Sequence, residues 1–168
     1  MYKVFGICLI IAMGYIQSSY ANEQIAFVNI DKIINQSEFG KKSFKKIDTN
    51  FKKEKEKLIK IEKALISKEQ EILKQKNILS EEELKNKISS LKKEIDEFQK
   101  KRISVREKFN KEKLDKTNEM VDKLNSILSK FADENQISLI IQKKFIVIGK
   151  STLDITDKIL DIFNKEVK

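Results

Sequence analysis

The stretch QIAFVNI, residues 24–30, has the composition of a β-strand. β-Branched and aromatic side chains are crowded into a short run, which is typical of strands. Roughly the next hundred residues contain no second run of this kind. A lone strand leaves its backbone N–H and C=O groups unpaired and does not fold by itself. The strand therefore needs a partner from a distant part of the sequence.

Candidate partners lie in the stretch DENQISLIIQKKFIVIGKS, which follows Phe131 and contains two short apolar runs. These are Ile137–Ile141 and Phe145–Ile148, separated by three polar residues. We expect the two runs to form a hairpin that pairs with strand 24–30. Beyond it, Asp154 is predicted to cap a short amphipathic helix that covers the sheet with one face, formed by Ile155, Ile159, Ile162 and Phe163.

The long middle of the chain carries a heptad pattern of apolar residues, which predicts coiled-coil helices. The first series is Phe44, Ile47, Phe51, Leu58, Ile61, Leu65, Ile72 and Leu79. The second series is Leu84, Ile88, Leu91, Ile95, Phe98, Val105 and Phe109. From Leu114 onward the apolar residues follow a shifted register, and such a break indicates a stutter or a change of packing partner.

A helix start is predicted between the two series, where Ser80 and Glu83 have the spacing of a capping box. We expect helices over about 38–77 and 81–133 that fold back on each other as an antiparallel hairpin. A single uninterrupted helix is the alternative, because no Gly or Pro forces a turn here. The hairpin returns the chain to its origin, so that strand 24–30 can meet its partner.

The N-terminus has the features of a secretory signal peptide. Val4–Ile16 is almost entirely apolar but too short to span a bilayer, and small residues follow at Ser19 and Ala21. We expect residues 1–21 to be removed near Ala21, with an uncleaved anchor as the alternative.

The predicted fold class is α+β, with a small body that carries a long arm. Residues 22–37 and 134–168 form a β-rich association body, and residues 38–133 form the helical arm with its tip near 77–81.

The composition argues against an enzyme. After residue 21 the chain has no Cys, His, Pro or Trp, and only two of its four Gly residues remain. The usual metal ligands, the imidazole base, the thiol nucleophile and the glycine-rich phosphate loop are therefore missing. We expect no catalytic residues, no metal site and no cofactor.

Both faces of strand 24–30 are apolar, so one short helix is too little to cover the sheet. We expect sheets from several chains to merge into one core, with a monomeric mini-domain as the alternative. The candidates for this oligomer core are Ile25, Phe27, Val28, Ile137, Leu139, Ile141, Phe145 and Val147.

Two segments carry a resemblance to a known family. The stretch IAFVNIDKIINQSEFGKK is similar to the first strand and helix entry of the Skp (OmpH-like) periplasmic chaperones, and ISLIIQKKFIVIGKSTLDITDKIL to their closing segment. The resemblance implies a homotrimer whose helical hairpins surround a cavity. It also implies an ATP-independent holdase that keeps unfolded outer-membrane proteins soluble in the periplasm for assembly. Contact with lipopolysaccharide or a membrane surface is left open, because this chain is richer in Lys, Ile and Asn than better-known members.

Two basic stretches, 41–60 and 100–116, are expected to lie at the same height near the body. They would attract acidic clients, less strongly as salt rises. The candidates for client binding are Lys41, Lys42, Lys45, Lys46, Lys100, Lys101, Arg102, Ile103, Arg106 and Lys108. Phe98 and Phe109 fit the seam between the helices better than a free surface.

Two other classes of function remain open from the sequence. A pI near 9.4 suits a polyanion-binding protein, but export and the lack of a groove-reading motif argue against nucleic acid as its partner. A structural or adaptor coiled coil of the envelope would explain the heptads but not the terminal strands.

Overall fold

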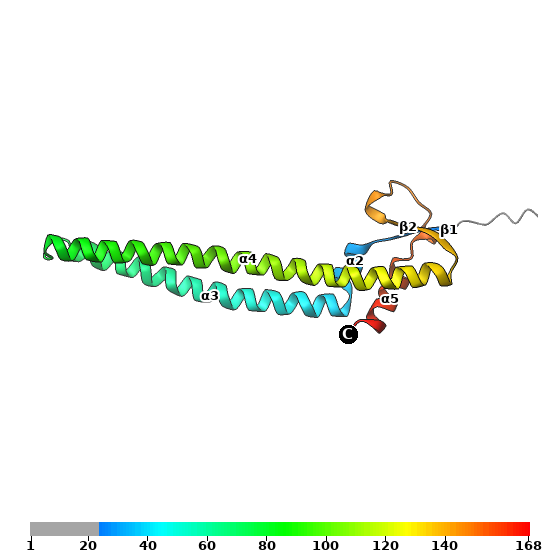
Figure 1. Cartoon of the computed structure of the whole chain (residues 1–168), viewed down its shortest axis with the longest axis horizontal. Coiled ribbons are helices and arrows are strands. Elements are labelled where there is room, and N and C mark those ends of the chain that lie inside the picture. Colours follow the sequence, from blue (N-terminus) through cyan, green and yellow to red (C-terminus); the bar gives the residue numbers. More distant parts are fainter. Residues whose placement is uncertain (1–23) are drawn as a thin grey trace, which may run out of the picture.

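The computed structural model describes residues 24–168, which form a long two-helix arm attached to a small body (Figure 1). The elements are β1 (Gln24–Val28), α2 (Ile30–Gln36), α3 (Glu38–Gln75), α4 (Glu81–Glu134), β2 (Ile137–Gln142), the 3₁₀ turns η1 (Lys143–Phe145) and η2 (Ser151–Leu153), and α5 (Thr156–Glu166). The predicted signal peptide lies outside the described residues. No helix within 24–168 has both the length and the apolar character needed to cross a membrane.

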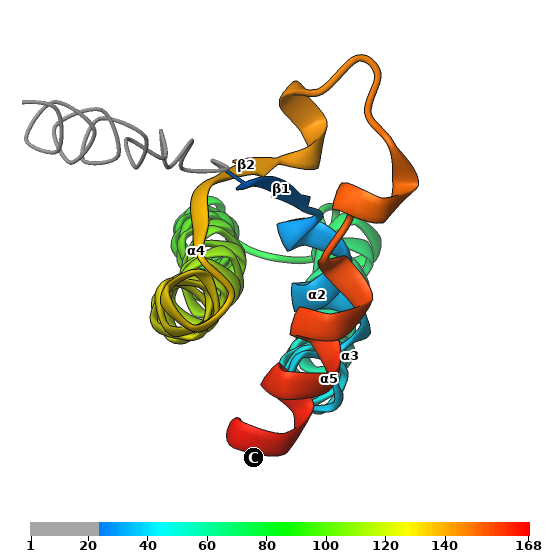
Figure 2. The same cartoon turned by 90° about the vertical axis from the view of Figure 1, so that its right-hand side faces the viewer.

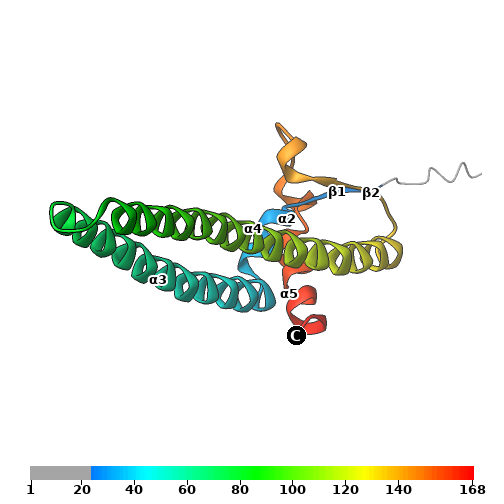
Figure 3. The same ribbon diagram turned by 60° about the vertical axis from the view of Figure 1, so that its left-hand side comes forward.

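The arm is the predicted antiparallel hairpin of α3 and α4 (Figures 1 and 3). Ser80 begins α4 with a complete capping box, which confirms the prediction. The Glu83 backbone N–H donates to Ser80 Oγ at 3.3 Å, and the Ser80 N–H donates to the Glu83 carboxylate at 3.0 Å. These bonds satisfy two N–H groups that the first turn leaves unpaired, so a turn forms here without Gly or Pro. The alternative of one uninterrupted helix is wrong.

The body has one apolar core, built where α4 extends past the start of α3 (Figures 1 and 3). The end of α4 contributes Met120, Leu124, Ile127 and Leu128, and these side chains pack against Ala26, Val28, Ile33, Ile34, Ile155, Ile159, Phe163 and Val167. The heptad shift after Phe109 has this physical cause: α4 changes its partner from α3 to the body.

The sheet of the body joins the two ends of the described chain. β1 pairs with β2 in parallel, with Ile25 opposite Leu139 and Phe27 opposite Ile141. The predicted pairing of the N-terminal strand with one of the two apolar runs is thus confirmed, and its partner is run 137–141. A parallel pair needs a long crossover connection, and the arm is that connection. β1 ends two residues before the predicted boundary, because Asn29 caps α2 by accepting a hydrogen bond from the Lys32 N–H at 2.9 Å.

The predicted C-terminal hairpin is wrong, because Phe145–Ile148 is not a strand. Residues 143–145 form the turn η1, and 146–150 have no regular structure. The connection lacks the Gly or Asn that tight hairpin turns require. The second edge of β1 is also occupied, since the Ile155 N–H donates to the Phe27 carbonyl at 3.0 Å.

The start of α5 differs slightly from the prediction. α5 begins at Thr156, so Ile155 and not Asp154 occupies the N-cap position. The Asp154 carboxylate still accepts a hydrogen bond from the Thr156 N–H at 3.0 Å. The buried Thr156 hydroxyl in turn accepts from the Asn29 N–H at 2.9 Å. A single side chain thereby ties the end of β1 to the start of α5.

Gly40 lies in the first turn of α3, at the corner with α2. A Cβ at this position would lie 1.8 Å from the carbonyl oxygen of Ile34 and 2.8 Å from Ser37 Oγ. The two helices therefore meet at a distance that only glycine allows.

Candidate functional site

The part of the arm near the body contains a pair of stacked phenylalanines. Phe51 of α3 and Phe109 of α4 have ring centroids 4.1 Å apart and planes inclined by 25°. Between Phe98 and Met120, α4 has no fully buried side chain. The aromatic stack thus joins the helices across a stretch where α4 buries no other side chain fully, although α3 buries Ile47 and Leu58.

A groove lies on each side of this stack. Both grooves are lined by Phe51, Val105 and Phe109, and their remaining lining residues differ. Their volumes are ≈ 580 Å³ and ≈ 630 Å³. They define two faces of the arm. We call the face of the first groove, which Lys53, Lys57 and Lys101 line, the polar face. We call the face of the second groove, which Ile59 and Ile103 line, the aliphatic face.

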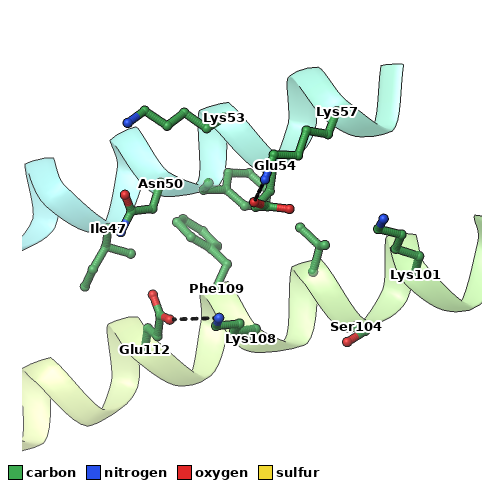
Figure 4. A pocket seen from close by; sticks show the side chains of 12 residues that line it. Ile47, Asn50, Lys53, Glu54, Lys57, Lys101, Ser104, Lys108, Phe109 and Glu112 are labelled. Carbon is green, nitrogen blue, oxygen red and sulfur yellow. Dashed lines mark hydrogen bonds and ion pairs between the residues drawn. The ribbon is translucent and has the colours of Figure 1, made fainter. Parts of the chain in front are cut away.

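The polar face carries two ion pairs, and Lys53 and Lys101 lie beside them (Figure 4). Lys57 donates to the Glu54 carboxylate at 2.6 Å, and Lys108 lies 4.0 Å from Glu112. The hydrogen bond from Lys57 lowers the pKa of Glu54. Farther toward the tip, Lys68 of α3 binds Glu94 of α4 and lowers the pKa of that carboxyl group in the same way. This ion pair also fixes the relative height of the two helices.

The aliphatic face presents large apolar side chains to solvent. Ile59 and Ile103 line its groove, together with Arg102 and Arg106. Further exposed residues follow toward the tip, spaced by seven residues on α3 and by seven or eight on α4, which is about two helical turns and keeps them on this side of the arm. We call the complete set the aliphatic ladder: Ile59, Ile66 and Leu73 of α3, and Ile88, Ile95 and Ile103 of α4, which are between 38 % and 65 % exposed.

The heptad pattern does not reveal this ladder, because it places Ile88 and Ile95 in the buried seam together with Leu91 and Phe98. Of these four residues, only Leu91 and Phe98 are buried. The α3 members, such as Ile59, each follow a seam residue by one position. Their regular seven-residue spacing is the sequence feature from which a second apolar row could have been predicted.

The predicted client-binding residues are distributed around the arm and not gathered on one surface. Lys101 and Lys108 border the polar face, while Arg102, Ile103 and Arg106 border the aliphatic face. Lys42 and Lys46 line a third groove beside Phe39, nearer the body. The remaining candidates, Lys41, Lys45 and Lys100, are exposed. As predicted, the two basic stretches lie side by side, since Phe51 stacks on Phe109. The role of these residues stays a prediction.

The predicted oligomer-core residues fall into three groups. Phe27 and Val28 are buried by this chain itself, Ile137 and Ile141 are half-buried, and Ile25, Leu139, Phe145 and Val147 are exposed. The exposed members lie on the sheet and on the loop that follows it, which projects from the body in Figure 2. The next residue in that loop, Ile148, is exposed as well. Their part in oligomer formation also stays a prediction.

Residues 24–168 contain no cluster of three or more His, Cys, Asp or Glu side chains that could hold a metal ion.

Comparison with known proteins places the whole described architecture in one family. The family model for outer membrane protein (OmpH-like) matches residues 24–163, which include both body and arm. A crystal structure of a candidate outer membrane chaperone (OmpH-like) from Caulobacter crescentus CB15 superposes with a TM-score of 0.80 at 14% sequence identity, covering 87% of this chain and 86% of that one. A search of curated proteins gave no match. The chain belongs to the OmpH-like family.

Proposed function

We propose that this protein is an ATP-independent holdase of the periplasm that binds unfolded outer-membrane proteins between the arms of a homotrimer. The observation that carries the proposal is the free-standing arm. Figures 1 and 3 show α3 and α4 extending far from the body without any other element beside them. The OmpH-like family and the chaperone description of the Caulobacter protein support the same function.

The body has the features of an association surface. Val147 is 100% exposed and its neighbours Phe145 and Ile148 are 71% and 92% exposed. Within the described chain, β2 has no strand partner other than β1. Unpaired strand edges beside exposed apolar side chains are prone to pair with another chain. Merging three such bodies would bury these groups and hold three arms around a common space.

The arm suits a client that has no fixed structure. An unfolded barrel protein exposes alternating apolar residues and aggregates through them. Several shallow apolar contacts on an arm can shield such a chain without a single ordered interface, because each weak contact is replaceable by another. The formal net charge of +9 adds a long-range attraction for acidic clients that salt would screen.

Two measurements on the exported chain test the proposal. Light scattering should give a molar mass close to three times that of one chain. Dilution of a urea-denatured outer-membrane barrel protein into buffer without ATP should produce no turbidity in the presence of the protein. A monomer that leaves the client to aggregate would refute the proposal.

The same experiment separates the two alternatives. An adaptor coiled coil should fail to keep the client soluble. A polyanion binder should bind DNA at 0.15 M salt, roughly physiological ionic strength, but leave the denatured client unprotected.

A further inference from the structure

The two faces of the arm differ in the side chains that they expose. On the polar face, lysines and glutamates form ion pairs within and between the helices. On the aliphatic face, six large apolar side chains remain between 38 % and 65 % exposed. A single exposed apolar residue is ordinary, but a continuous row on one face marks an interaction surface.

The six residues form three rungs, because the antiparallel register places them in pairs. Ile59 and Ile103 line the same groove. The contacts of Lys68 with Glu94 and of Lys87 with Gln75 continue that register toward the tip. The next rungs are therefore formed by Ile66 with Ile95, and by Leu73 with Ile88. Neighbouring rungs are separated by seven residues on α3 and by seven or eight on α4, which is about 10.5–12 Å along a helix.

One edge of the ladder is basic. This is the α4 edge, where Lys85 and Lys92 precede and follow Ile88 by about one turn. Arg102 and Arg106 line the groove at the first rung, and Lys55 and Glu62 of α3 line its opposite side. Within the described residues, none of these four basic side chains of α4 forms a salt bridge. They differ in this respect from Lys57, Lys68 and Lys108 of the polar face, and they are available to a partner that carries carboxylates.

We propose that the aliphatic ladder and its basic edge are the client-contacting face of the arm, and that the occupant is a segment of unfolded polypeptide with aliphatic side chains and nearby acidic residues. The inference rests on the proposed holdase function and specifies which side of the arm performs it. A second copy of the arm would bring the same basic edge into contact with this one, so like charges disfavour it. A segment of opposite charge with exposed aliphatic groups satisfies both features of the face.

A triple substitution of ladder residues tests the apolar contacts. Ile66→Gln and Ile95→Gln remove both members of the second rung, and Leu73→Gln removes one member of the third. Gln has a helix propensity close to that of the original residues. Binding of a fluorescent, urea-denatured acidic barrel protein should weaken by about tenfold or more, given the apolar area that three half-exposed side chains offer. The matched control is Ile78→Gln in the tip turn, because Ile78 is 81% exposed and lies outside the ladder. This control should bind as the unmodified protein does, and circular dichroism should show equal helicity in all variants.

A photo-crosslinking amino acid gives an independent measurement of which face the client touches. Placed at position 66 it should capture the client, whereas at position 57 on the polar face it should capture little. Equal capture at both positions, or unchanged affinity of the triple variant, would overturn the inference while leaving the holdase function intact. Capture of a second copy of the arm at position 66 in the presence of client would also overturn it. If the unmodified protein fails to bind the client, the proposed function itself fails.

Discussion

Replacing Gly40 with alanine tests the close packing at the corner between α2 and α3. In the exposed interior of a helix, replacing glycine with alanine stabilises the fold by about 1 kcal/mol, because alanine has the higher helix propensity. Here the added Cβ would lie 1.8 Å from the backbone oxygen of Ile34, far inside the contact distance. Backbone atoms cannot rotate away as a side chain can, so the corner itself must open.

The two effects have opposite signs, and their sizes decide the outcome. Overpacking of a tight site costs typically 1–3 kcal/mol, and a clash with the backbone belongs at about the upper end of that range. Subtracting the propensity gain of about 1 kcal/mol leaves a net destabilisation of about 2 kcal/mol for Gly40→Ala. Gly149→Ala should cost less, because its Cβ would meet the movable ring of Phe27 at 2.9 Å. Thr49→Ala is the control for propensity alone, since Thr49 is exposed and bonds only to the Lys45 carbonyl.

Urea denaturation followed by circular dichroism measures these changes, at one fixed protein concentration because oligomer stability depends on it. We expect the lowest midpoint for Gly40→Ala and an unchanged or slightly higher midpoint for Thr49→Ala. A Gly40→Ala variant as stable as the original, with the same m-value, would show that the corner is not packed as described.

Four further changes have expected outcomes. Thr156→Val leaves the Asn29 N–H without its acceptor in a buried place and should lower the free energy of unfolding by about 2 kcal/mol in urea denaturation; a neutral result would contradict the described link. Ser80→Ala removes the capping box and should cost about 1 kcal/mol, seen as faster amide hydrogen exchange confined to the tip. Phe109→Ala removes the aromatic stack and should cost about 2 kcal/mol, with increased exchange in the adjacent turns; unchanged exchange would mean that the stack does not join the helices. Burial raises the pKa of Asp154, but hydrogen bonds from Lys143 and Thr156 outweigh it and hold the pKa below its ordinary value. The stabilisation from this carboxylate is therefore complete above the ordinary pKa of Asp and is lost as pH falls through the lower folded-state value, and the pH dependence of its carboxyl ¹³C shift should have a midpoint below that of an unstructured Asp.

The arm was predictable because its signals are local. Ser80 and Glu83 are three residues apart and complete their hydrogen bonds without help from the rest of the fold. The seam repeats over many turns, so its helices follow from the pattern alone. The pairing of β1 with β2 was also within reach, because few stretches of the chain have the composition of a strand.

The remaining features depend on contacts that the sequence pattern does not specify. The run at Phe145–Ile148 has strand composition, but a strand also needs a free edge, and Asp154 and Ile155 occupy that edge of β1. The ladder was missed for a related reason. Apolar residues occupy adjacent columns of the same helix, and only the rotation of α4 against α3 decides that Leu91 is buried while Ile88 is exposed.

The parallel pairing of β1 with β2 has a consequence for the order in which the molecule assembles. Asn29 and Thr156, which meet in the body, are 127 residues apart in the sequence. During synthesis β1 is completed long before β2 exists, and closing a flexible chain of this length is entropically slow. Helices form quickly because their hydrogen bonds join neighbouring residues. Once α3 and α4 have packed against each other, β1 and β2 lie close enough to pair. Formation of the arm thus precedes and promotes formation of the body. A substitution that slows folding of the tip turn should therefore also delay the pairing of β1 with β2 at the opposite end of the molecule.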